Sequence, residues 1–187
     1  YVDVHILMLE RMYHKRLKGY AELGYQVKMS GQDASVSQIY DGQNYFVPFT
    51  TGLNDAAADI LIVSPFLKMA RIKAVLPTLE KAVSAGVSVV VCTKPVGDYR
   101  PEQQAAVERS IALLAGSGVT VETHPALQHR YAVIDRSVVW YGSIDYLSYS
   151  VKDANALRFE NADIAGELLD LLSEEDPPEQ MQMEQLI

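Results

Sequence analysis

The chain has 187 residues, enough for one domain with a sizeable hydrophobic core, and 49% of them are hydrophobic, which excludes a disordered polypeptide. We find no apolar run of membrane-spanning length and no signal-peptide pattern. The formal net charge of −8 argues against nucleic-acid binding, but nine acidic residues and no Lys or Arg lie between Glu160 and Ile187, so the rest of the chain is close to neutral.

The first 30 residues predict an amphipathic helix that acts as a connector. Apolar residues recur at helical spacing from Val4 to Leu23 among several Lys and Arg residues, and Gly24 would end the helix. Its basic face is either a solvated surface or a strip that follows a nucleic-acid backbone. The chain begins at Tyr1 without Met, so we expect a piece of a longer protein or a processed form.

Residues 31–172 predict one α/β domain in which apolar strands alternate with helices. Short strands are possible at Gln26–Met29 and Val36–Tyr40; the main strands are predicted at Asp59–Val63, Val87–Thr93 and Val119–Thr123, and the helices at Asn44–Asp55, Lys68–Ala85 and Glu102–Leu114. This order predicts a mixed, largely parallel sheet with helices on both faces.

A tight hairpin of two buried strands is predicted from Arg130 to Tyr141, with Arg136-Ser137 as the polar break. Gly142-Ser143 follows, where a chain leaving a strand can present backbone N–H groups and a hydroxyl to an anion. One more strand is possible at Ala156–Phe159, before a last helix at Asp163–Leu172 with Asn161 as its cap. Residues 173–187 are interpreted as a loosely held acidic tail.

No metal or cofactor site is predicted. The four His residues are scattered, and neither a Walker loop nor a Cys/His zinc spacing is present. The lone cysteine, Cys92, lies in a β-branched run and is interpreted as a small core residue of a protein in the reducing cytoplasm.

The segment from Gln128 to Asp145 resembles the signature of the phospholipase D superfamily, which is His, any residue, Lys, four residues, Asp, six residues, then Gly-Ser-x-Asn. Asp135 and the pair Gly142-Ser143 are in place. Three positions differ: Gln128 stands at the nucleophilic His, Arg130 at the Lys and Asp145 at the Asn. The resemblance spans residues 36–172.

The chain is also similar to the single-motif domains attached to bacterial DEAD/DEAH-type helicases. That similarity rests on Ser64-Pro65-Phe66 after the first main strand, on Trp140-Tyr141-Gly142-Ser143 after the hairpin, and on Ala165-Gly166-Glu167-Leu168 in the last helix. It implies an upstream helicase domain in the same parent chain as a partner.

The superfamily resemblance implies a metal-independent mechanism for an intact member. A His attacks the phosphorus of a phosphodiester, and a second His from another motif copy protonates the leaving oxygen and later activates water. The Lys residues and the Gly-Ser segment hold the non-bridging oxygens. A chain with one motif can complete such a site only in a homodimer, across a two-fold axis.

The substitutions predict phosphate binding without covalent catalysis. An amide at Gln128 cannot be the nucleophile but can donate a hydrogen bond, and the Arg130 guanidinium suits phosphate bidentately. We therefore expect Gln128, Arg130, Gly142, Ser143 and Asp145 to form the phosphate site, with the Asp145 carboxylate repelling the anion.

Two histidines are alternatives for the missing nucleophile. Strand alternation places His129 on the face opposite to Gln128 and Arg130, so only a bulge would bring it into the site. His124 would have to reach in from a loop beyond Pro125. Asp135 has two interpretations as well, as the acidic residue of the catalytic motif or as a cap of the hairpin turn.

Three functions remain open. The first is a phospholipase D-like domain with a substituted site that binds nucleic-acid phosphates as an accessory part of a helicase or nuclease system. The resemblance favours DNA over RNA as the nucleic acid. The second is an active phosphodiesterase that uses His129 or His124. The third is a dimerisation module without a ligand. All three predict a cytoplasmic protein without a membrane partner.

Overall fold

The computed structural model describes residues 37–148 and 153–174. Within these residues seven strands form one sheet, in the spatial order β1-β7-β6-β5-β2-β3-β4. The strands are β1 (Gln38–Asp41), β2 (Asp59–Val63), β3 (Ser88–Thr93), β4 (Thr120–Thr123), β5 (Tyr131–Ile134), β6 (Val138–Gly142) and β7 (Asn155–Glu160). The helices are α2 (Phe46–Asn54), α3 (Met69–Ser84), α4 (Pro101–Gly116) and α5 (Ala162–Glu174), with a 3₁₀ turn, η1, at Val96–Asp98.

The predicted mixed α/β sheet is confirmed, but its parallel part is smaller than expected. Only β2, β3 and β4 pair in parallel, whereas the pairs β2–β5, β5–β6, β6–β7 and β7–β1 are antiparallel. The reason is that β5 lies beside β2 with the opposite direction, a three-residue turn then adds β6, and β7 pairs antiparallel with β6. The sheet is therefore mixed, as predicted, but its described strand pairs are mostly antiparallel and not largely parallel.

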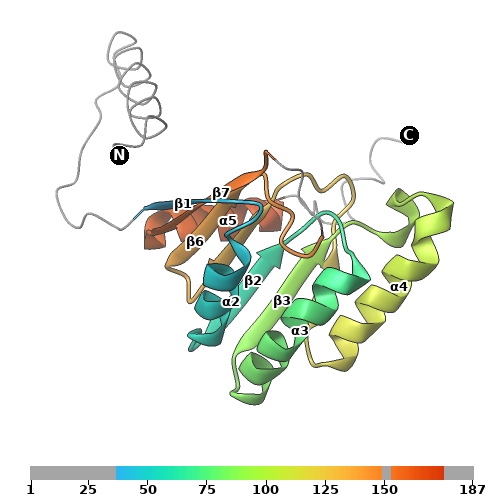
Figure 1. Cartoon of the computed structure of the whole chain (residues 1–187), viewed down its shortest axis with the longest axis horizontal. Coiled ribbons are helices and arrows are strands. Elements are labelled where there is room, and N and C mark those ends of the chain that lie inside the picture. The colour runs from blue at the N-terminus through green and yellow to red at the C-terminus, as the bar shows by residue number, and fades with distance from the viewer. Residues whose placement is uncertain (1–36, 149–152, 175–187) are drawn as a thin grey trace, which may run out of the picture. The chain divides into compact units, whose positions relative to one another are not determined.

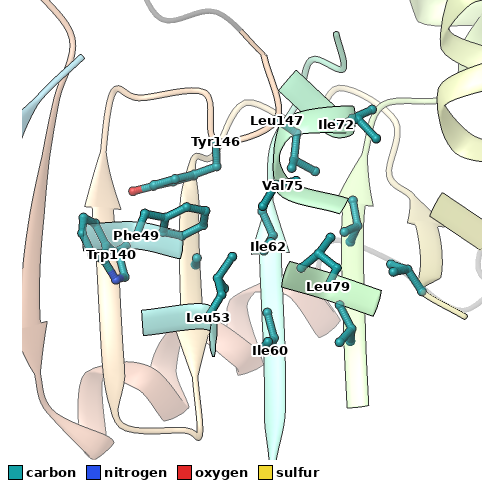
Figure 2. Packing of buried hydrophobic residues seen from close by; sticks show 14 of the residues in the cluster. Phe49, Leu53, Ile60, Ile62, Ile72, Val75, Leu79, Trp140, Tyr146 and Leu147 are labelled. Atoms are coloured by element: carbon teal, nitrogen blue, oxygen red, sulfur yellow. The ribbon is translucent and has the colours of Figure 1, made fainter. Parts of the chain in front are cut away.

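Helices cover both faces of the sheet, as predicted (Figure 1). Helices α2, α3 and α4 lie on one face and α5 on the other. The sequence of β2 is continuously apolar because both of its faces are buried. Ile60 and Ile62 belong to the core under α2 and α3, and Leu61 and Val63 belong to the core under α5. Figure 2 shows the first of these cores, in which Phe49 of α2 packs beside Trp140 of β6.

The ends of two elements follow from single residues. The Asn161 side-chain oxygen accepts the N–H of Ile164 at 3.0 Å, so the predicted cap of α5 is confirmed. The hairpin turns through Asp135 and Arg136, which have φ values of 50° and 52°, and the Ser137 N–H donates to the Ile134 carbonyl at 3.2 Å. Positive φ at two successive residues is typical of hairpin turns, and the three residues Asp135 to Ser137 separate the paired Ile134 and Val138.

The predicted connector at residues 1–30, including the strand at Gln26–Met29, lies outside the described residues, as does the tail beyond Glu174. Across residues 37–148 and 153–174, no helix combines the length and the hydropathy that crossing a bilayer requires.

Candidate phosphate-binding site

Most of the motif residues lie at one edge of the sheet, where the ends of several strands meet. Strands β2, β3, β4 and β6 run in the same direction and end at this edge, and the segment leading into β5 starts there. In open α/β sheets, ligands bind at the carboxyl ends of the strands. The edge carries Phe66 after β2, Lys94 after β3, Arg130 before β5, and Ser143 and Asp145 after β6.

Arg130 and Asp145 form an ion pair at this edge. The Arg130 Nε lies 3.2 Å from the Asp145 Oδ2, and the two side chains are 25% and 12% exposed. The Arg130 Nη1 also donates to the Gln128 carbonyl at 3.1 Å. The guanidinium is therefore held in place by its own chain, and much of its charge is balanced by Asp145.

The environment of Asp145 opposes ionisation. Burial raises the pKa of Asp145 above its ordinary value, and the positive charges of Arg130 and Lys94 reduce this shift without cancelling it. The carboxyl group therefore gains its proton at a higher pH than an exposed aspartate does.

Phe66 lies close to two cations at the same edge. Its ring is 37% exposed, with the Lys94 Nζ 4.8 Å and the Arg130 Cζ 5.9 Å from the ring centroid. These distances suit cation–π contact. The edge of the sheet thus combines an accessible aromatic ring with two positive charges. Sequence reasoning assigned no role in the site to Phe66 or Lys94, although Lys94 directly follows β3 and Phe66 is the third residue after β2.

The loop that carries Phe66 is anchored by buried hydrogen bonds. The Pro65 carbonyl accepts the Tyr99 hydroxyl at 2.8 Å and the Thr93 hydroxyl at 3.4 Å. The Ser64 hydroxyl accepts the N–H of Leu147 at 3.2 Å, which ties the loop to the segment after Asp145. The position of Phe66 is therefore set by rigid elements on both sides.

A pocket of about 440 Å³ adjoins this loop. Phe66, Tyr99, Asp145 and Ser148 line it together with Lys68 and the first turns of α4. The pocket is large enough to hold a nucleotide-sized group.

Gly142 and Ser143 are used mainly in packing. A Cβ atom on Gly142 would lie 2.2 Å from the Asn155 carbonyl oxygen, so only glycine allows β7 to approach β6 so closely. The Gly142 N–H donates to the Arg130 carbonyl at 3.4 Å, and the Ser143 N–H donates to Asn155 at 2.8 Å. The Ser143 hydroxyl accepts the Asn155 N–H at 3.1 Å and donates to the Asn155 carbonyl at 3.5 Å, so its side chain also helps to join the two strands.

The remaining candidate residues are divided between three places. Gln128 is exposed and His129 half-buried in the irregular segment before β5, which begins at Tyr131, so regular strand alternation does not extend to them. His124 is buried at the end of β4, where its Nε2 lies 3.7 Å from a Glu122 carboxylate oxygen. The structure thus brings Gln128, Arg130, Ser143 and Asp145 to one edge. His124 follows β4 at the same edge and donates its N–H to the Thr93 carbonyl at 2.9 Å.

Asp135 lies at the opposite end of β5, about 16 Å from Arg130 at the rise of an extended strand. Its carboxylate accepts the backbone N–H groups of Ala57, Ala58 and Asp59 at 2.7–3.1 Å. Asp135 therefore stabilises the turn that leads into β2. It acts as a cap, as one of its two interpretations expected, but the turn that it caps is not the hairpin turn.

The fold resembles that of known proteins, although no protein-family model and no curated protein matches the sequence. Nuc, a phospholipase D family member from Salmonella typhimurium, superposes with a TM-score of 0.57 and 17% identity over 74% of this chain and 93% of Nuc. NucT from Helicobacter pylori gives a TM-score of 0.58 and 10% identity over the same shares. TrmBL2, an archaeal chromatin protein whose structure shows a mode of DNA binding, gives a TM-score of 0.52 and 11% identity over 92% of this chain and 62% of TrmBL2. The chain therefore has a phospholipase D-like fold.

Proposed function

We propose that this domain binds the phosphodiester backbone of single-stranded nucleic acid at the edge formed by Phe66, Lys94 and Arg130, and that it does not cleave it. The observation that carries the proposal is the partly exposed Phe66 ring with two cations, Lys94 and Arg130, within 6 Å of its centroid. Single-stranded nucleic acid is bound by this combination, because bases stack on an aromatic ring while neighbouring phosphates meet positive charge.

The residue at the nucleophile position supports binding over hydrolysis. Gln128 is exposed at the same edge but carries no nitrogen that can form a phospho-enzyme. Arg130 supplies the positive charge of the family's Lys, and its ion pair with Asp145 keeps the affinity for an anion moderate. A moderate affinity suits an accessory domain that releases its strand.

The proposal includes a biological context. The motif resemblance favours DNA over RNA and a parent protein with an upstream helicase domain, or a nuclease system in which this domain holds the strand. One motif copy per chain favours a homodimer in which two such edges meet. The DNA-binding neighbour TrmBL2 supports the nucleic-acid assignment at the level of fold.

Alanine at Phe66 should weaken binding to a fluorescent oligothymidine by about 5- to 100-fold, because stacking contributes about 1–3 kcal/mol per base. Alanine at Lys94 should weaken it less and lower the slope of log affinity against log salt by about one. Lys81→Ala is the matched control, because Lys81 lies in the last turn of α3 at the other end of the sheet. Anisotropy titrations at several salt concentrations measure all three. Equal losses from Lys94→Ala and Lys81→Ala would show non-specific attraction and contradict the proposal.

The unmodified protein should show no EDTA-resistant hydrolysis of oligonucleotides or bis-nitrophenyl phosphate, and His129→Ala should change nothing. The double substitution Gln128→His with Arg130→Lys restores the family's residues and should give trace hydrolysis if the homodimer brings two histidines together. Gel assays and nitrophenolate release measure both. A metal-independent activity of the unmodified chain that His129→Ala abolishes would establish a working phosphodiesterase in place of a binding domain.

A further inference from the structure

Three side chains with metal-binding atoms meet on the side of the sheet that α5 covers. Cys92 of β3 and Glu122 of β4 are direct partners in the parallel pairing of the two strands. His124 follows two residues after Glu122, so the extended chain places it on the same face. Cys92 is fully buried, the His124 side chain is 5% exposed and the Glu122 side chain is 50% exposed.

The distances between these atoms suit one metal ion. The Cys92 Sγ and the His124 Nε2 each lie 3.7 Å from the Glu122 Oε2, and one ligand atom from each residue lies within 4.8 Å of the others. A tetrahedral zinc ion with a sulfur at about 2.3 Å and nitrogen or oxygen at about 2.0–2.2 Å separates its ligand atoms by roughly 3.4–3.6 Å. Two of the three separations therefore match within a few tenths of an ångström.

We propose that Cys92, Glu122 and His124 form a zinc-binding site. A thiolate, an imidazole and a carboxylate together favour Zn²⁺, whereas Mg²⁺ and Ca²⁺ prefer oxygen ligands alone. Three protein ligands leave a fourth position for water. The half-exposed Glu122 provides the path of entry, because it also lines a cavity of about 300 Å³ beside Leu169 and Leu172 of α5.

The site has a structural consequence for the phosphate-binding edge. Strand β4 has four residues and lies at the border of the sheet, so it pairs on one side only. A metal ion would fasten it to β3 and fix His124, and the five residues from Pro125 to His129 lead from there to Arg130. Zinc at this position would therefore stabilise the start of the segment that carries Arg130, without contacting nucleic acid.

The test uses the full chain without a polyhistidine tag, reduced with a phosphine and freed of metal with a chelator. Competition with a chromophoric chelator should give one Zn²⁺ per chain, and zinc binding near neutral pH should release a proton from the Cys92 thiol, because the thiolate is the ligand. Substitution with Co²⁺ should give a thiolate-to-cobalt charge-transfer band and the strong visible absorption of tetrahedral cobalt. Zn²⁺, and not an equal concentration of Mg²⁺, should raise the thermal midpoint.

Glu122→Gln and His124→Gln should each weaken zinc binding by about 100-fold or more, since even groups that only orient a ligand change affinity 10- to 100-fold. Cys92→Ser should remove the charge-transfer band. Glu108→Gln, which removes an exposed carboxylate from α4, should change nothing. If Cys92→Ser does not fold, the Glu122→Gln variant tests the site instead, because the Glu122 side chain is half-exposed.

Three results would overturn the zinc site. The first is binding well below one zinc per chain at micromolar metal. The second is a cobalt form without the charge-transfer band, and the third is an affinity that both Glu122→Gln and His124→Gln leave unchanged. Any of them would make Cys92 an ordinary core residue beside a His–Glu contact.

Discussion

Alanine at Asp135 should lower the free energy of unfolding by about 2–4 kcal/mol, because hydrogen bonds to a charged acceptor contribute about 1.5–3 kcal/mol each and water compensates part of their loss. The carboxylate accepts three successive backbone N–H groups, from Ala57, Ala58 and Asp59, and so fastens the chain entering β2 to the hairpin. Urea denaturation at pH 7 measures the loss.

The stabilisation by Asp135 should also depend on pH. Burial acts to raise the pKa of Asp135, but the hydrogen bonds from Ala57, Ala58 and Asp59 together outweigh it and hold the pKa below the ordinary value of 3.8. A carboxylate with a lowered folded-state pKa stabilises the fold above its unfolded pKa, and this contribution is lost as pH falls through the folded value.

Asp135→Asn is the matched variant, because it keeps one acceptor oxygen and the shape of the side chain but no charge. Its stability should fall between those of the unmodified protein and Asp135→Ala at pH 7. Its deficit against the unmodified protein should shrink below pH 3.8, where the aspartate begins to be protonated. A deficit that stays constant down to pH 2 would show that the carboxylate charge contributes nothing.

Asp135 also shows what a motif can and cannot predict. The motif match rests on six residues between Asp135 and Gly142, but the hydrogen-bond partners of Asp135 lie 76 to 78 residues earlier in the chain. Local reasoning looks for partners within a turn, so it assigned the cap to the hairpin itself. The apolar runs, in contrast, are local properties, and they predicted the strands to within one or two residues.

The arrangement of the sheet explains the other differences. Apolar strands alternating with helices predict βαβ units, yet no local pattern indicates that β5 pairs antiparallel with β2. That pairing brings Arg130 beside the ends of β2 and β3, and hence beside Phe66 and Lys94. In the same way, Cys92 and Glu122 become partners only through the register of β3 with β4. Scattered histidines in the sequence therefore did not exclude a metal site in the fold.

Replacing Asp145 by asparagine, the family's residue, should strengthen the binding of single-stranded DNA by about 5- to 20-fold at low salt. The Asp145 carboxylate lies 3.2 Å from the Arg130 Nε, so its loss leaves the guanidinium charge to the phosphate, and charge-assisted hydrogen bonds are about twice as strong as neutral ones. The salt slope should rise by up to about one, as for one additional phosphate contact.

A double-mutant cycle shows whether Arg130 carries this gain. Arg130→Ala should weaken binding by about 1–3 kcal/mol, and Asp145→Asn should add little in that background. Glu102→Gln is the control for charge alone, because Glu102 is an exposed carboxylate that lines the neighbouring pocket. Anisotropy titrations of the four proteins, with circular dichroism to confirm folding, give the coupling energy.

The pH dependence of binding provides an independent test of the same ion pair. Burial raises the pKa of Asp145, so its carboxyl group is neutralised at a higher pH than that of an exposed aspartate. Lowering the pH should therefore strengthen DNA binding by the unmodified protein, whereas the affinity of Asp145→Asn, which has no carboxyl group to titrate, should change much less. Parallel pH profiles for the two proteins, or equal gains from Asp145→Asn and Glu102→Gln, would contradict the control of Arg130 by Asp145.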